Sequence, residues 1–179
     1  MVVPETPLEM TKFGLRPAGH GWFIVSAREM RWDTGDFGAF CDFEGKRGFP
    51  DFGINLNVLQ PGQPMGMYHR ESRQEDFLVL AGTCLLIVEG EERELKTWEL
   101  FHCPPGTEHI IVGAGDEPAV VLAVGARGRR RRGMVYPVLK AAQKHRAGVK
   151  KETTEPSEAY GGFAGWNRSL YQEGWLPDL

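Results

Sequence analysis

Residues 61–109 read PGQPMGMYHRESRQEDFLVLAGTCLLIVEGEERELKTWELFHCPPGTEH. His69 and Glu71 stand two residues apart in this stretch, so on a β-strand their side chains leave the same face. Glu75 lies six residues beyond His69, which is about 20 Å along a straight strand at roughly 3.3 Å per residue. The three side chains can share a site only if the chain turns back in the polar segment before Glu75. A second hairpin must then return the chain to His109.

The first part of the stretch resembles a motif of the cupin family, in which a glycine is followed by an H-x-H pair, a glutamate and a second glycine. Four residues match this motif at the family's spacing: Gly62, His69, Glu75 and Gly82. Glu71 departs from the motif, because it stands where the second histidine is usual.

The second cupin motif has the core P-x-G-x-x-H, which Pro104, Gly106 and His109 match, whereas Gly113 replaces an asparagine that is often found there. The resemblance covers roughly residues 52–125. It implies an all-β fold, the cupin double-stranded β-helix or jelly-roll barrel, with a short helical and coil arm at its C-terminal side. A fold of this kind carries many chemistries, so the fold alone does not name a function.

The apolar pattern outside the motifs also predicts short antiparallel strands. Residues 52–59 alternate, with three aliphatic side chains on one face and Asn55 and Asn57 on the other, where they line either the cavity mouth or a solvated face. A hairpin is predicted around Gly90. The further predicted strands are Gly38–Phe43, Phe77–Ala81, Cys84–Val88, Leu95–His102, His109–Val112 and Ala119–Val124.

The chain is interpreted as three segments: an N-terminal arm over 1–20, the cupin barrel over 21–126, and a basic loop with an aromatic C-terminal arm over 127–179. Residues 1–126 contain 10 Lys and Arg against 19 Asp and Glu, a net −9, whereas residues 127–179 contain 11 against 5, a net +6. Opposite charges favour docking of the arm on its own barrel or on that of a partner subunit. A short helix is predicted over Val138–His145.

Composition indicates a globular protein, with 41% hydrophobic and 25% charged residues. No apolar run approaches the ~20 residues of a membrane helix, and the first residues lack the basic and apolar regions of a signal peptide. The cysteines Cys41, Cys84 and Cys103 form no CxxC pair. We therefore expect reduced thiols, a cytoplasmic location and no membrane partner.

The histidine–carboxylate set points to a divalent metal ion, since imidazole nitrogen and carboxylate oxygen are ligands of zinc, iron, manganese and nickel. The resemblance assigns His69, Glu75 and His109 as ligands. Glu71 is either a further metal ligand or a catalytic general base beside the metal. The competing interpretation is a metal-free remnant of such a site inside a binding pocket.

Two classes of function remain open at this point. The first is a metal-dependent enzyme acting on a small organic molecule in the barrel cavity, an oxygenase if the metal is iron and an isomerase or lyase otherwise. The second is a non-catalytic cupin that binds a sugar-like or anionic ligand. Nucleic acid is disfavoured as a partner of the cluster Arg127–Arg132, because the body of the chain is acidic. A homodimer clasped by the C-terminal arm is expected, with docking of the arm on its own barrel as the alternative.

Overall fold

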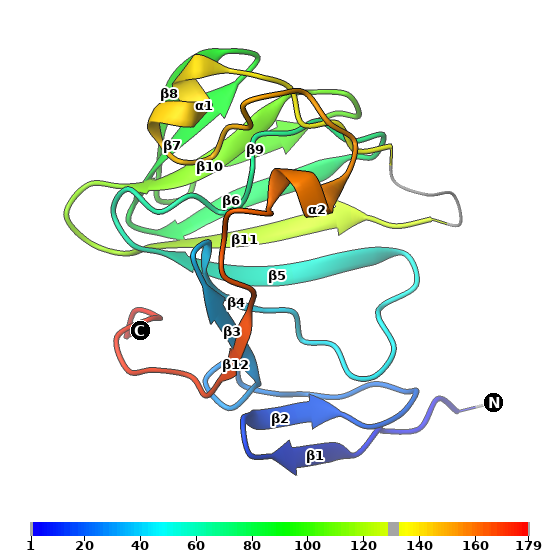
Figure 1. The fold of residues 1–179 in the computed structure, drawn as a ribbon. Helices are drawn as coiled ribbons and strands as arrows, with labels where there is room; N and C mark the ends of the chain where they lie inside the picture. Colours follow the sequence, from blue (N-terminus) through cyan, green and yellow to red (C-terminus); the bar gives the residue numbers. More distant parts are fainter. Residues whose placement is uncertain (1, 129–132, 179) are drawn as a thin grey trace.

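The computed structural model describes residues 2–128 and 133–178, whose regular secondary structure is mostly β-strand (Figure 1). Its strands are β1 (Leu8–Thr11), β2 (Gly14–Pro17), β3 (Trp32–Gly35), β4 (Gly38–Cys41), β5 (Phe52–Leu59), β6 (Glu75–Ala81), β7 (Thr83–Val88), β8 (Glu91–Lys96), β9 (Leu100–Cys103), β10 (His109–Ala114), β11 (Ala119–Ala126) and β12 (Asn167–Ser169). Two short helices, α1 (Lys140–Lys144) and α2 (Pro156–Ala159), follow the last long strand. The all-β expectation is confirmed.

Two antiparallel sheets build the body of the fold. The larger has the strand order β12-β3-β4-β5-β11-β6-β9, and the smaller has the order β10-β7-β8. Strands β1 and β2 form a separate hairpin, which Figure 1 shows at the end of the molecule away from β7 and β8. The chain crosses between the two sheets after β6, β8, β9 and β10, so residues distant in sequence face each other across the interior.

The main core lies between the two sheets. Its buried side chains come from β5, β6, β7, β9, β10 and β11, and include Leu59, Phe77, Leu86, Ile111 and Val121. Adjacent strands contribute alternate residues to this interior, as the pleat of a β-strand requires. Removal of this apolar surface from water is the main driving force for closing the two sheets on each other.

Strand β5 is covered on both faces. Leu59 packs in the core between the sheets, whereas Val58 packs in a second cluster with Trp32 and Cys41 on the outer side. Asn57 is buried, and its Nδ2 donates a hydrogen bond to the carbonyl oxygen of Val121 at 3.5 Å. The alternation of this strand was interpreted correctly as a strand, but its polar face at Asn57 is not solvated.

Local differences from the sequence expectations arise at turns. The segment predicted as one strand over Leu95–His102 is divided between β8 and β9, and Trp98 at the break has a positive φ of 72°. The hairpin expected around Gly90 is confirmed, with φ of 48° at Glu89 and 84° at Gly90. The N-terminal arm is more ordered than its loose composition indicated, because it contains the β1–β2 hairpin.

The aromatic C-terminal arm packs against its own chain. Trp175 and Tyr171 lie on Trp32, with ring centroids 5.0 and 6.1 Å away. The rings of Phe163 and Tyr160 lie on Phe37 at 4.7 and 5.1 Å. Strand β12 joins the same arm to the larger sheet by pairing with β3. The arm therefore adopts the alternative arrangement, docking within the subunit, and the homodimer stays a prediction.

The structure can also be compared with the predictions for the cysteines and for the short helix. Cys41, Cys84 and Cys103 are free and buried. The short helix expected over Val138–His145 is confirmed as α1. No helix within 2–128 and 133–178 has the length and hydropathy needed to cross a membrane. Arg129–Arg132 of the basic cluster fall outside the described residues, so the role of that cluster stays a prediction.

Loss of the Trp32 side chain should destabilise the fold strongly. Trp32 is fully buried and its indole N–H donates to the carbonyl of Ala27 at 2.8 Å. Trp32→Ala should lower the free energy of unfolding by about 3–5 kcal/mol, the cost of a large cavity. Urea unfolding followed by circular dichroism measures the change. The control Trp98→Ala removes a ring that is 74% exposed and should cost no more than about 0.5 kcal/mol. Equal losses in the two variants would contradict the assigned core.

Candidate metal site

The backbone brings His69 and His109 together before their side chains interact. His69 lies in the segment between β5 and β6, and His109 is the first residue of β10. The two residues form an antiparallel bridge in which each N–H donates to the other's carbonyl, at 3.1 and 2.8 Å. Glu75 begins β6, where it is paired with Gly125 of β11 and Cys103 of β9. The turn expected before Glu75 is therefore present.

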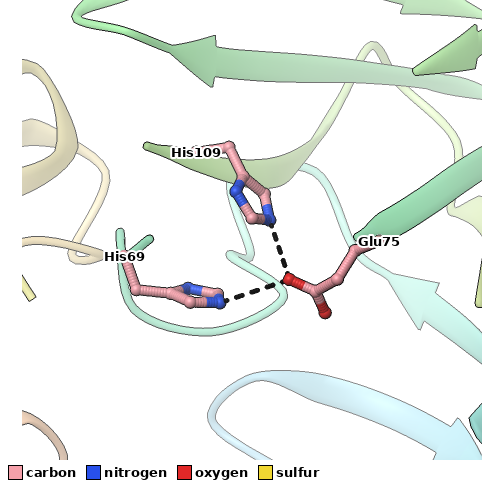
Figure 2. A group of neighbouring side chains, drawn as sticks. All are labelled: His69, Glu75 and His109. Atoms are coloured by element: carbon pink, nitrogen blue, oxygen red, sulfur yellow. Dashed lines mark ion pairs between the residues drawn. The ribbon is translucent and has the colours of Figure 1, made fainter. Parts of the chain in front are cut away.

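The three side chains converge on one point (Figure 2). The Nε2 atoms of His69 and His109 lie 3.7 and 3.5 Å from Oε2 of Glu75, and the three potential ligand atoms lie within 4.8 Å of one another. Ligands bound about 2.1 Å from a tetrahedral zinc ion are separated by roughly 3.4 Å. The cluster is thus slightly wider than a closed site, and small side-chain rotations would bring it to coordination distance.

The oxygen at the centre of this cluster lacks a conventional partner. Both histidine contacts are at or beyond the upper limit of a hydrogen bond. Oε2 of Glu75 is buried and has no hydrogen-bond partner among the described residues. A buried carboxylate oxygen left in this way costs free energy, which a bound cation would recover. The residues present therefore fit a metal ion.

Backbone carbonyls fix the proton on each imidazole. Nδ1 of His69 lies 2.7 Å from the carbonyl oxygen of Met67, and Nδ1 of His109 lies 3.1 Å from that of Thr107. A carbonyl oxygen only accepts, so Nδ1 is the protonated nitrogen in both rings. The Nε2 lone pairs of the neutral rings then face Glu75, the tautomer that metal-binding histidines adopt.

The pKa values show how the three groups depend on one another. Burial lowers the pKa of His109, and the nearby His69 lowers it further. Burial also acts against the charged form of His69, but the Glu75 carboxylate outweighs this effect and the pKa of His69 is raised. For Glu75, burial acts to raise the pKa, yet His69, His109 and Glu71 together lower it. The Glu75 carboxylate is therefore ionised, and it faces the Nε2 atoms of both imidazoles.

Glu71 lies beside this cluster but outside the set of mutually close ligand atoms. Its side chain is 3% exposed, and it interacts with Glu75 strongly enough to lower the pKa of that residue. Glu71 also contributes to the raised pKa values of His69 and Tyr136. The same-face relation of Glu71 with His69 and its role as ligand or base stay predictions.

Other side chains complete the surroundings of the cluster. Phe77 and Phe101 lie 5.3 and 5.8 Å from the ring of His109, and Tyr136 lies 6.0 Å from that of His69. The Sγ atom of Cys103 lies 3.3 Å from Nδ1 of His109, and burial raises the pKa of the Cys103 thiol to about 12. The spacing of the motifs carries no signal for Tyr136, which follows the last long strand.

Two further polar side chains near the cluster make contacts outside it. His102 is largely exposed, and its Nδ1 pairs with Asp76 Oδ1 at 2.6 Å. Tyr68 is buried and donates a hydrogen bond to Glu108 at 3.3 Å. Neither belongs to the group of potential ligands.

The comparison with protein families agrees with this geometry. The family model described as "Cupin domain" matches residues 55–125, the segment that carries the three ligand candidates. Residues 55–125 form a cupin domain. The match begins within β5 and ends within β11, so it includes both strands that flank Glu75 and the whole smaller sheet.

Individual relatives of the cupin domain are distant. The chain is 31% identical over 75 residues to mannose-1-phosphate guanylyltransferase from Escherichia coli, a match that covers 42% of this chain and 16% of that enzyme. Among solved structures, it is similar to a putative sugar phosphate isomerase from Acidithiobacillus ferrooxidans, with 27% identity, a TM-score of 0.45, and coverage of 49% and 56% of the two chains. It is also similar to a sugar phosphate isomerase of the cupin superfamily from Silicibacter pomeroyi, with 21% identity, a TM-score of 0.49, and coverage of 79% and 85%.

Removal of either histidine should abolish stoichiometric metal. His69→Ala and His109→Ala each delete one of the two nitrogen donors, and Glu75 with a single histidine is a weak site. Protein purified without a chelating tag and loaded with zinc or iron should fall to background metal content by elemental analysis. The control His102→Ala removes an exposed imidazole outside the cluster and should keep full metal content. Full content in all three variants would refute the site.

Metal affinity of the cupin domain should depend on pH through His69. Metal binds the neutral imidazole, and Glu75 raises the pKa of His69 above the ordinary 6.5. Affinity should therefore be complete above this raised pKa and weaken as the pH falls through it, beginning above pH 6.5. Calorimetric titration in buffers of different ionisation enthalpy should show proton release on binding at neutral pH. Constant affinity between pH 8 and 5.5 would contradict this assignment.

Proposed function

We propose that the cupin domain holds a divalent first-row metal ion with His69, Glu75 and His109 and is an enzyme acting on a small organic molecule. One observation carries the proposal: two imidazoles, each with Nδ1 at hydrogen-bond distance from a backbone carbonyl, direct their Nε2 atoms at one buried carboxylate oxygen. Two histidines and one carboxylate leave coordination positions for substrate oxygen atoms.

Glu71 is the residue proposed to move a proton. When bound, a metal ion polarises a carbonyl or hydroxyl oxygen and makes a neighbouring C–H or O–H group more acidic. Two adjacent buried carboxyl groups do not both ionise readily, and Glu75 is the one whose pKa is lowered. Glu71 is buried beside Glu75 and lies outside the close ligand set, so it is the carboxyl group assigned to proton transfer. Its position outside the close ligand set favours the base role over direct coordination.

The surroundings favour proton transfer over a simple surface interaction. His109 and Glu71 are almost completely buried, and Phe77 and Phe101 enclose the His109 ring. Exclusion of water strengthens the electrostatic interactions of a bound substrate. Among the reactions expected from the sequence, isomerase or lyase chemistry uses such a proton acceptor directly. Iron would add oxygenase chemistry, and the four candidate metals are not distinguished by this ligand set.

The second candidate is a cupin that binds a sugar-like or anionic ligand without catalysis. It is favoured by the position of two hollows of about 530 and 440 Å³, neither of which is lined by His69, Glu75 or His109. An enzyme needs space for substrate at the metal, so turnover depends on whether a small compound reaches the cluster. The relative named mannose-1-phosphate guanylyltransferase makes phosphorylated sugars the first compounds to test.

Glu71→Gln should separate the two candidate functions. Metal-loaded protein is incubated in D₂O with pools of phosphorylated sugars, keto acids and hydroxy acids, and exchange of carbon-bound hydrogen is followed by proton NMR. If Glu71 moves the proton, the variant should keep its metal and lose about 10²–10⁴-fold in rate. The control Glu94→Gln makes the same change on the exposed strand β8 and should leave the rate unchanged.

The outcomes differ for each interpretation. Exchange by the wild type that depends on Glu71 and on metal supports the enzyme. Binding of a compound without exchange, unchanged in Glu71→Gln, supports the non-catalytic candidate. Loss of metal in Glu71→Gln would make Glu71 a ligand and overturn its role as base.

A further inference from the structure

The larger of the two hollows mentioned above lies outside the cupin domain, between the end of the β1–β2 hairpin and the loop that joins β4 to β5. Its volume is about 530 Å³, within the range of roughly 300–1,000 Å³ typical of small-molecule sites. Residues 17–21 with Phe23 form one wall, and residues 45–50 form the other. Figure 1 shows that the hairpin and this loop lie on the same side of β5, away from β7 and β10.

The cavity has a charge opposite to that of its surroundings. Residues 1–126 carry a net charge of −9, yet the lining contains Lys46, Arg47 and His20 and no aspartate or glutamate. The nearby Glu44 is already neutralised, because its Oε1 lies 2.7 Å from Nη2 of Arg127. A cationic hollow in an acidic body concentrates anions and excludes cations.

Hydrogen-bond donors are gathered in the same place. Nη1 of Arg47 lies 2.8 Å from Nε2 of His20, which must accept because a guanidinium only donates. The other donors of Arg47 and the ammonium of Lys46 face no carboxylate in the lining. The backbone N–H groups of residues 45–48 make no hydrogen bond within the described part of the chain. Such successive N–H groups beside basic side chains suit an oxyanion.

The walls of the cavity are held by close contacts. A Cβ atom on Gly45 would lie 2.1 Å from the carbonyl oxygen of Pro17, so the loop and the hairpin approach each other at backbone distance. Nη1 of Arg127 donates to the carbonyl of Phe49 at 2.9 Å and ties the same loop to the end of β11. Lys46 and Arg47 therefore lie on a loop that is held by contacts with Pro17 and Arg127.

An aromatic wall stands beside the donors. The rings of Phe23 and Phe49 are stacked with centroids 6.3 Å apart and planes 19° apart, and both line the cavity. This surface offers contact to an apolar or ring-shaped portion of a ligand. The cavity therefore combines one cationic, donor-rich region with one apolar region.

We propose that this cavity is a binding site for a small molecule that carries a phosphate group. Lys46, Arg47 and the N–H groups of residues 45–48 bind the phosphate, and the Phe23–Phe49 surface contacts the organic portion. The donors outnumber the acceptor oxygens of one carboxylate, whereas phosphate offers three oxygens and close to two negative charges. The site is independent of His69, Glu75 and His109.

Binding is tested by calorimetric titration of the full chain, stripped of metal, with inorganic phosphate, AMP and citrate at 0.15 M salt. AMP should bind more tightly than inorganic phosphate, because its base can contact the phenylalanine rings. Lys46→Ala/Arg47→Ala should weaken AMP binding by at least about tenfold, since each lost phosphate contact removes a charge-assisted hydrogen bond. Phe23→Ala should weaken AMP and leave phosphate unchanged.

The matched control is Arg93→Ala/Lys96→Ala, which removes the same charge from the exposed strand β8. It should leave AMP binding within about twofold of the wild type. An equal loss of AMP affinity in this control would show that the weakening depends only on the net charge of the protein, and it would overturn the site. Absence of binding by the wild type at millimolar phosphate and AMP, or tighter binding of citrate than of either, would overturn it as well. Loss of AMP binding in His109→Ala would place the ligand at the metal cluster instead.

Discussion

The pair of backbone hydrogen bonds between His69 and His109 holds together the part of the molecule on which the candidate site depends. The two residues are 40 positions apart, and the intervening chain must form β6, β7, β8 and β9 before it returns. Because the bridge is made by main-chain atoms, it sets the separation of the imidazoles independently of their side-chain chemistry. The ring centroids consequently lie 4.8 Å apart. Glu75 reaches the same point from the larger sheet, so the cluster also joins the two sheets.

The cluster is an energetic exception inside an apolar core. Phe77, Cys103 and other residues of the core between the sheets surround ionisable groups that would be more stable in water. The protein limits this cost by giving Nδ1 of each imidazole a backbone carbonyl as hydrogen-bond acceptor and by placing the Glu75 carboxylate next to both rings. The Oε2 atom of Glu75 still lacks a hydrogen-bond partner among the described residues, so a bound cation should stabilise the fold. A ligand that binds only the folded state raises the free energy of unfolding as its concentration increases.

Sequence alone was sufficient where spacing and local turns determine the structure. The intervals among His69, Glu75 and His109 identify the cluster, and Gly90 identifies the β7–β8 hairpin. The sequence was insufficient where a backbone atom or a segment distant in sequence determines a side chain's protonation or burial. The carbonyls of Met67 and Thr107 fix the tautomers, but any residue type supplies a carbonyl. The buried Asn57 side chain donates its hydrogen bond to Val121 of another strand, and alternation within β5 contains no information about that neighbour. The aromatic arm similarly indicated docking without indicating which subunit it contacts.

The attachment of β12 to the edge of the larger sheet also affects how the chain reaches its native state. Asn167 pairs with Thr34, and Tyr171 and Trp175 cover Trp32, so the outer cluster is completed by residues more than 130 positions downstream of the strand they cover. During synthesis, β3 and β4 must therefore wait for the C-terminal arm with part of their apolar surface exposed. Contacts so distant in sequence are formed late and slow the search for the native topology. A ribosome-bound chain that ends before β12 is the species in which chaperone binding and misassembly through the free edge of β3 are expected.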